Sequence, residues 1–150
     1  MKKLIFLFGL LTLFVTSMTF QASAEAPERK MTVQETVAYY AQVNGVDPNL
    51  ALSMMMCESK GKQGAKGDGN RATGIFQFWN DTWKRHSLKY FGEILDINSS
   101  LDQAKVATAA IAGGDGREWT SYRSIMNGGS YTFYYKLEQR YITVKCKLLP

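Results

Sequence analysis

The chain has 150 residues and a formal net charge of +5 at neutral pH, with 45% hydrophobic and 21% charged residues. This length suits one domain, and a mild basic excess without any basic run gives no reason to expect nucleic-acid binding. With two cysteines, one histidine and no CxxC pair, the sequence also predicts no metal site and no cofactor.

Residues 1–24 have the features of a secretory signal peptide. Lys2 and Lys3 precede an apolar run over residues 4–15, and residues 22–24 read A-S-A, a site at which cleavage is expected after Ala24. The apolar run is shorter than the ~20 residues that span a bilayer as a helix. We therefore expect export to the periplasm, the cell wall or the extracellular space, without stable membrane insertion after cleavage. The alternative is an uncleaved N-terminal anchor.

The mature chain is expected to be a mainly helical single domain. Residues 25–31 are charged and contain a proline, which indicates a short disordered leader, and residues 32–150 are expected to form the domain. Its first helix should begin at Thr32, which forms a capping box with Glu35, and should end near Val43.

A second helix is predicted from Asp47-Pro48, a cap followed by a first-turn proline, to about Glu58. Leucine and methionine lie on nearly every side of it, so we expect it to be the buried central helix. Residues 59–73 then contain four glycines and many polar residues, which indicates an exposed loop or a small β-hairpin.

Two further helices are predicted downstream. Asn80 or Asp81 should cap a helix that contains Trp83, and Ser99 or Ser100 should cap a helix that ends at Ala112 before a glycine break. The periodicity of residues 131–149 is compatible with either a helix or a strand. The last predicted helix has a face suited to close packing, formed by Leu101, Ala104, Ala107 and Ile111.

The two cysteines, Cys57 and Cys146, both follow the predicted signal peptide. In an oxidising compartment we expect them to form one disulfide, and the alternative is a pair of free thiols.

Glu58 is a carboxyl at the end of the most apolar helix, after Met54-Met55-Met56-Cys57. Burial and the negative end of the helix dipole should both raise its pKa, as a general acid requires. Lys60 and Lys62 would oppose this shift if they turned inward. The alternative is an ordinary exposed glutamate.

Several motifs occur in a specific order. Cys57-Glu58-Ser59, the glycine-rich loop, G-I-F-Q-F at residues 74–78 and Thr82-Trp83 together resemble the lytic transglycosylase family of the lysozyme-like superfamily. The G-V-D-P-N-L segment at residues 45–50 is similar to that family's lead-in to its catalytic helix. The Cys-Glu-Ser, Gln-Phe and Thr-Trp segments are also similar to the resuscitation-promoting factors, in which the same cysteine is disulfide-bonded.

The resemblance implies a lysozyme-like α domain of about six helices that binds peptidoglycan glycan strands. Glu58 would protonate the oxygen between N-acetylmuramic acid (MurNAc) and N-acetylglucosamine (GlcNAc) and would then act as the base, giving a 1,6-anhydro product. Ser59 would hydrogen-bond near the sugar, Gly74 would allow close approach of backbone to glycan, and Gln77 would contact the sugar. The alternative for Gln77 is a buried amide that satisfies backbone groups.

The family's Ala-Tyr-Asn segment, whose tyrosine faces the acid, is not found in this sequence. Trp119 and Tyr122 are our candidates for the far wall of the cleft instead. For Trp79, Trp83 and the aromatic cluster at residues 131–135 we expect core packing.

Two other functions compete with transglycosylation. A hydrolase of the muramidase type needs a second carboxylate, for which Asp68 is the best candidate, although a loop aspartate commonly forms a turn. A glycan-binding module of the same fold would not turn over substrate. A resemblance by chance, in a secreted structural or effector domain, is a further alternative. The sequence names no protein partner.

Overall fold

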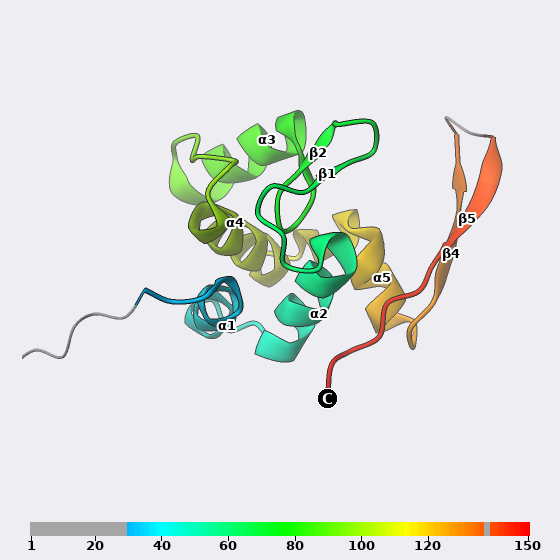
Figure 1. Cartoon of the computed structure of the whole chain (residues 1–150), viewed down its shortest axis with the longest axis horizontal. Helices are drawn as coiled ribbons and strands as arrows, with labels where there is room; N and C mark the ends of the chain where they lie inside the picture. Colours follow the sequence, from blue (N-terminus) through cyan, green and yellow to red (C-terminus); the bar gives the residue numbers. More distant parts are fainter. Residues whose placement is uncertain (1–29, 137–138) are drawn as a thin grey trace, which may run out of the picture.

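The computed structural model describes residues 30–136 and 139–150. The predicted signal peptide and most of the predicted leader lie outside the described residues. No helix in the described part is long and apolar enough to cross a membrane. The elements are α1 (Val33–Val43), α2 (Pro48–Ser59), β1 (Lys66–Gly67), β2 (Ala72–Thr73), β3 (Phe78–Trp79), α3 (Asn80–Phe91), α4 (Ser100–Ala112), the 3-10 helix η1 (Asp115–Glu118), α5 (Thr120–Met126), β4 (Tyr131–Tyr135) and β5 (Arg140–Val144) (Figure 1).

The capping signals in the sequence determine where α1 and α2 begin. The backbone N–H of Glu35 donates to Thr32 Oγ1 at 3.2 Å, and Thr32 N–H donates back to Glu35 Oε2 at 2.8 Å, which is the predicted capping box. Asp47 Oδ1 accepts from Asn49 N–H at 2.9 Å before the first-turn proline of α2. The helix ends where Lys60 adopts the left-handed conformation, with φ of 60°. Both predicted helices are confirmed.

α2 is the central helix of the domain. It packs between α1 and α5, and Met54 and Met55 are fully buried in the core. The loop after α2 contains the predicted hairpin, formed by β1 and β2, and β3 adds a third antiparallel strand that the sequence did not indicate. Glu58 therefore lies in the last turn of the central helix, just before the segment that leads into this small sheet.

Two details of the next helices differ from the sequence predictions. α3 begins at Asn80 itself, and its N-cap residue is Trp79, which makes no side-chain capping bond, so the predicted Asn80 or Asp81 cap is wrong. α4 is capped as predicted, because Ser99 Oγ accepts from Asp102 N–H at 3.2 Å. Leu101 lies in the first turn of α4 and is 40% exposed, so it does not belong to the packed face.

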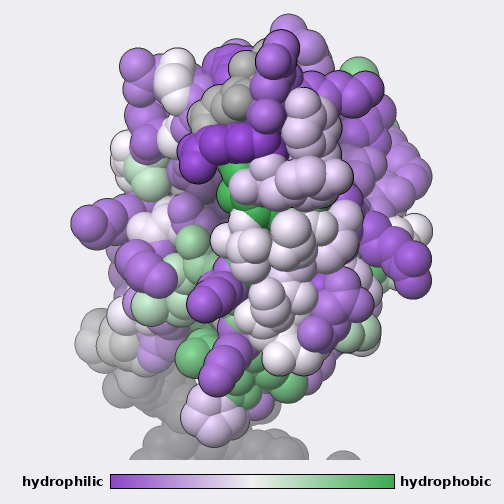
Figure 2. Space-filling model, turned by 90° about the vertical axis from the view of Figure 1, so that its right-hand side faces the viewer, coloured by the Kyte–Doolittle hydropathy of each residue, from purple (hydrophilic) through white to green (hydrophobic). Residues whose placement is uncertain are grey.

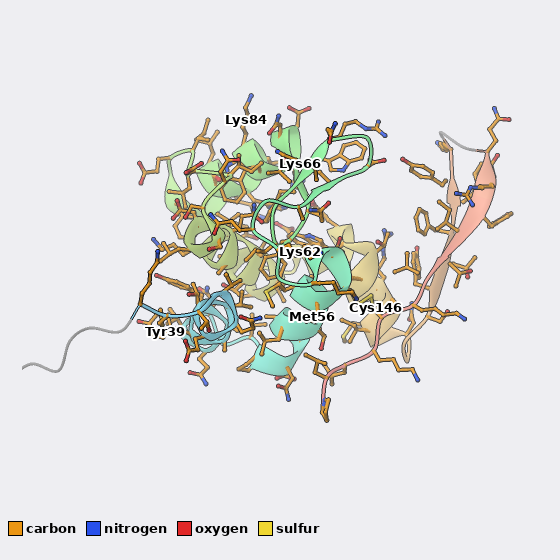
Figure 3. All side chains as sticks on the ribbon, in the orientation of Figure 1. Tyr39, Met56, Lys62, Lys66, Lys84 and Cys146 are labelled. Carbon is orange, nitrogen blue, oxygen red and sulfur yellow. A yellow bond between two sulfur atoms is a disulfide. The ribbon has the colours of Figure 1, made fainter. Side chains whose placement is uncertain are left out.

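β4 and β5 pair in antiparallel fashion as a β-hairpin, in which Tyr131 of β4 pairs with Val144 of β5. This hairpin stands to one side of the helices, and α5 lies between it and α2 (Figure 1). The predicted disulfide between Cys57 and Cys146 is confirmed, with 6.0 Å between the Cα atoms, and it ties the chain after β5 to the end of α2 (Figure 3). Ser124 of α5 adds to this attachment by accepting from Cys146 N–H at 2.9 Å.

Candidate active site

A cleft of about 570 Å³ opens beside Glu58. Its walls come from the end of α2, the β1–β2 turn, the segment from β3 into α3, the η1–α5 junction and the inner face of the β4–β5 hairpin. It is lined by Glu58, Asp68, Ala72, Gln77, Phe78, Trp79, Thr82, Glu118, Trp119, Thr120, Phe133, Tyr135 and Ile142. The structure thus brings together four of the residues singled out from the sequence: Glu58, Asp68, Gln77 and Trp119.

Glu58 is a half-buried carboxyl held by one side chain of α5. Ser121 Oγ donates to Glu58 Oε1 at 2.5 Å. Burial raises the pKa of Glu58, while hydrogen bonds from the hydroxyl and the backbone of Ser121 offset part of the shift. Lys60 and Lys62 are both exposed and do not turn inward. The predicted direction of the pKa shift is therefore confirmed, and Glu58 keeps its proton to a higher pH than an ordinary glutamate.

The structure places Ser59 and Gly74 behind the cleft, outside its lining. Ser59 Oγ donates to Ile75 O at 2.9 Å and accepts from Gly61 N–H at 3.1 Å, which fastens the end of α2 to the segment after the small sheet. Gly74 has a φ of +80°, and a Cβ there would collide with the buried amide of Gln103. Packing therefore explains the need for glycine at position 74, and the geometry gives no support to the predicted sugar contacts of these two residues.

Gln77 lines the cleft, but its amide is also used by the fold. Its Nε2 donates to Gly74 O at 2.8 Å and to Ala65 O at 3.3 Å, and its backbone has a φ of 51°. The Gln77 amide thus satisfies backbone groups, as the alternative interpretation expected. The side chain nevertheless borders the cleft.

Asp68 connects the β1–β2 turn with the hairpin at the cleft. Its Oδ1 accepts from Arg71 Nη2 at 2.9 Å and from the Tyr135 hydroxyl at 3.0 Å. The hydrogen bond to the Asp68 carboxylate raises the pKa of Tyr135. The guanidinium of Arg71 lies 4.8 Å from the ring centroid of Trp79, which is 44% exposed. The core-packing prediction for Trp79 is wrong, because this residue lies at the end of β3 and borders the cleft, whereas Trp83 is buried as expected.

Glu118 is a third carboxyl in the cleft and belongs to an ion-pair network. It accepts from Arg85 at 3.0 and 2.7 Å, and this pair lowers the pKa of Glu118. The fully buried His86 lies 3.1 Å from Glu118 and 3.4 Å from Asp115, and Lys89 binds Asp115 at 2.7 Å. Ligand atoms of His86, Asp115 and Glu118 lie within 4.8 Å of one another, but Arg85 and Lys89 already neutralise the two carboxylates. The geometry fits an ion-pair network better than a metal site.

A family model described as a transglycosylase SLT domain matches residues 35–114. The chain belongs to this family. Neither curated proteins nor solved structures gave a significant match to it. Membership of the SLT transglycosylase family agrees with the mainly helical, lysozyme-like domain and indicates a peptidoglycan-acting function of the lytic transglycosylase type. An action on peptidoglycan is consistent with a periplasmic or extracellular location.

The far wall of the cleft consists of residues that follow the matched segment of the SLT domain in the sequence. Trp119 lines the cleft and donates from Nε1 to Phe76 O at 2.9 Å. Tyr122 instead lies in a neighbouring hollow and packs against Gly116. The rest of the wall is Phe133, Tyr135 and Ile142 of the hairpin.

Sequence reasoning missed the hairpin wall and Ser121. The aromatic residues at 131–135 are alternately half-buried and exposed in β4, so the core-packing prediction for them is wrong. A period of two in Tyr131, Phe133 and Tyr135 was the available signal, but Tyr134 obscured it. For Ser121 the sequence carries no signal.

Proposed function

We propose that this SLT transglycosylase cleaves the β-1,4 bond between MurNAc and GlcNAc in peptidoglycan strands, with Glu58 as general acid and then general base. The observation that carries the proposal is a desolvated carboxyl with a raised pKa in an open cleft, within the Glu-Ser motif of the matched segment. Under this proposal residues 1–24 are removed on export, and residues 32–150 act as one catalytic domain.

The proposed reaction has two chemical steps and consumes no water. Glu58 gives its proton to the bridging oxygen, the bond from the MurNAc anomeric carbon to that oxygen breaks, and the GlcNAc side leaves with a free hydroxyl. The MurNAc 6-hydroxyl then bonds to its own anomeric carbon, and its proton returns to the Glu58 carboxylate. The product is a 1,6-anhydro sugar, and the acid is regenerated.

Ser121 acts as a positioning residue for the acid in this proposal. Its hydroxyl donates to Oε1 of Glu58, which leaves Oε2 to carry the acidic proton toward the glycosidic oxygen. Because a carboxyl rotates about its last bond, one fixed oxygen restricts the direction of the other. Ser121 therefore takes the place that the resemblance assigns to a tyrosine facing the acid.

The test is digestion of purified peptidoglycan by the wild type, by Glu58→Gln and by Glu93→Gln, a control at an exposed glutamate. Loss of the acid should slow clearing of the wall by about 10²–10⁴-fold, and the control should clear normally. Mass spectrometry should find fragments one water lighter than hydrolysis products and without a reducing end. A wild type that binds peptidoglycan without cleaving it would instead identify a glycan-binding module.

A hydrolase remains the second candidate, because Asp68 lines the same cleft as Glu58. Arg71 and Tyr135 hold Asp68 in a fixed orientation, as a carboxylate that positions water would need. In that case the products would have reducing ends, and Asp68→Asn would lower the rate by about 10²-fold or more. In a transglycosylase Asp68→Asn should keep most of the activity, since no water is activated.

A further inference from the structure

A second hollow, of about 310 Å³, lies beside the cleft and has a distinct chemical character. It is lined by Arg117, Tyr122, Arg123, Met126, Asn127 and Tyr131, which include two cations and no acidic residue. We call it the arginine pocket. Within the described part of the chain, neither of its arginines forms an ion pair. All of its lining residues follow residue 114, where the family match ends, so the family model does not account for it.

Arg123 is held in place by the hairpin. Its Nη1 donates to the Tyr131 hydroxyl at 3.3 Å, and its guanidinium carbon lies 4.6 Å from the centroid of the same ring. Its Nε is buried and has no hydrogen-bond partner. Arginine stays charged at every physiological pH, so this position holds a preorganised and uncompensated positive charge. An anion bound to the guanidinium would neutralise this positive charge.

The arginine pocket and the cleft share two walls. Arg117 directly precedes Glu118 and Trp119, which line the cleft. In β4, Tyr131 borders the arginine pocket, while Phe133 and Tyr135 border the cleft. The rings of Tyr131 and Phe133 stack at 5.9 Å, and that of Phe133 lies 6.3 Å from Tyr135. This aromatic row extends over about 13 Å of strand, so it leads from the catalytic cleft into the arginine pocket.

The outward face of the β4–β5 hairpin differs in polarity from the face that carries the aromatic row. Figure 2 looks onto the hairpin side and shows a pale band, neither strongly hydrophilic nor hydrophobic, between hydrophilic patches. The strand alternates exposed and half-buried residues, so Thr132 and Tyr134 face outward while the aromatic row faces the α5 side. The row and the arginine pocket therefore lie on the same inner face as the cleft.

We propose that the arginine pocket is a subsite for a carboxylate of the stem peptide that the glycan strand carries. The proposal rests on the proposed function, because a strand lying in the cleft would carry its own peptide to the pocket. Arginine binds carboxylates through two parallel hydrogen bonds, and Met126 and Tyr122 offer apolar surface to the aliphatic part of a peptide. The enzyme then prefers strands that carry peptides over strands without them.

The experiment compares glycan strands that bear stem peptides with strands from which an amidase has removed them. We expect kcat/KM of the wild type to be about tenfold higher on the peptide-bearing strands, the effect of one charge-assisted contact. Arg123→Gln and Arg117→Gln should each bring this ratio toward one. Lys84→Gln removes one positive charge from α3, away from the hairpin (Figure 3), and should keep the wild-type ratio.

A binding measurement separates this inference from the proposed function. A soluble stem peptide is titrated into the Glu58→Gln variant, with poly(glycerol phosphate) as the competing source of an anion. Peptide binding that Arg117→Gln weakens supports the subsite even if no strand is cleaved. An unchanged preference ratio in both arginine variants overturns the subsite while the transglycosylase proposal stands. Tighter binding of the phosphate polymer than of the peptide overturns the stem peptide as the ligand. Arg117 is exposed, so its variant should fold even if Arg123→Gln does not.

Discussion

Substitution of Gly74 by alanine tests whether this glycine serves the fold or the substrate. Gly74 has a φ of +80°, and its missing side chain leaves room for the Gln103 amide. That amide is buried and makes three hydrogen bonds: Oε1 accepts from Phe76 N–H at 3.0 Å, and Nε2 donates to Ile97 O at 2.6 Å and to Thr73 O at 3.2 Å. A methyl group at position 74 requires the amide to move.

The expected loss of stability has two parts. Alanine at a positive φ costs about 1–2 kcal/mol. If the movement of Gln103 leaves one buried group without its partner, this costs about 1–3 kcal/mol more, so Gly74→Ala should destabilise the domain by about 2–5 kcal/mol in total. This is a large part of the ~5–15 kcal/mol that stabilises a typical domain.

Urea unfolding followed by tryptophan fluorescence measures this loss. The matched control is Gly64→Ala, because a Cβ at Gly64 has no atom within 4 Å and its φ is not in the left-handed region. The control should unfold within about 0.5 kcal/mol of the wild type. Wild-type stability of Gly74→Ala together with a raised KM for glycan would refute the packing explanation, and would support the close backbone approach expected from the sequence.

Three further outcomes follow from the site and the disulfide. The raised pKa of Glu58 means that its ionisation is disfavoured in the folded state, so native stability falls as pH rises from the unfolded-state pKa through the higher folded-state pKa, by about 1.4 kcal/mol per unit of difference. In thermal melts, the melting temperature of Glu58→Gln should therefore rise relative to that of the wild type as pH increases through that window. A difference in melting temperature that does not change with pH would contradict burial as the cause. Ser121→Ala removes a bond that lowers the pKa of Glu58, so the alkaline limb of the kcat/KM profile should move to higher pH and kcat should fall; an unmoved limb would exclude the positioning role. Mutation of Cys57 and Cys146 to serine opens a loop with a sequence separation of 89 and should reduce the free energy of unfolding by about 4–5 kcal/mol in denaturant titrations, whereas a value near zero would mean that the bond adds nothing.

Local signals were sufficient to predict the matched part of the domain. Capping at Thr32 and at Asp47 acts within three residues, and the apolar sides of α2 require burial whatever the topology. The central position and the raised pKa of Glu58 follow directly from those two features. This is why the helix that carries the acid was predicted to within one residue of its end.

The features that the sequence did not predict depend on contacts between distant segments. Ser121 is 63 residues from Glu58, and Asp68 is 67 residues from Tyr135. A serine, an aspartate or a tyrosine at such positions has no local pattern that reveals its partner. Gln103 is similar, since a glutamine inside α4 normally faces water. Its burial depends on the space beside Gly74 and on backbone partners from distant segments.

The cleft is complete only when both halves of the chain are considered together. The matched segment provides Glu58, Asp68, Gln77 and Trp79, which line the cleft on one side. Residues after 114 provide Ser121, which donates to Glu58, and the hairpin as the other wall. The disulfide joins the two halves at Cys57, directly before Glu58, so the attachment of the hairpin is fixed one residue from the acid. Because this second wall differs from the Ala-Tyr-Asn pattern of the resemblance, we expect substrate preference to depend on the hairpin and α5, and we expect cleavage itself to depend on Glu58.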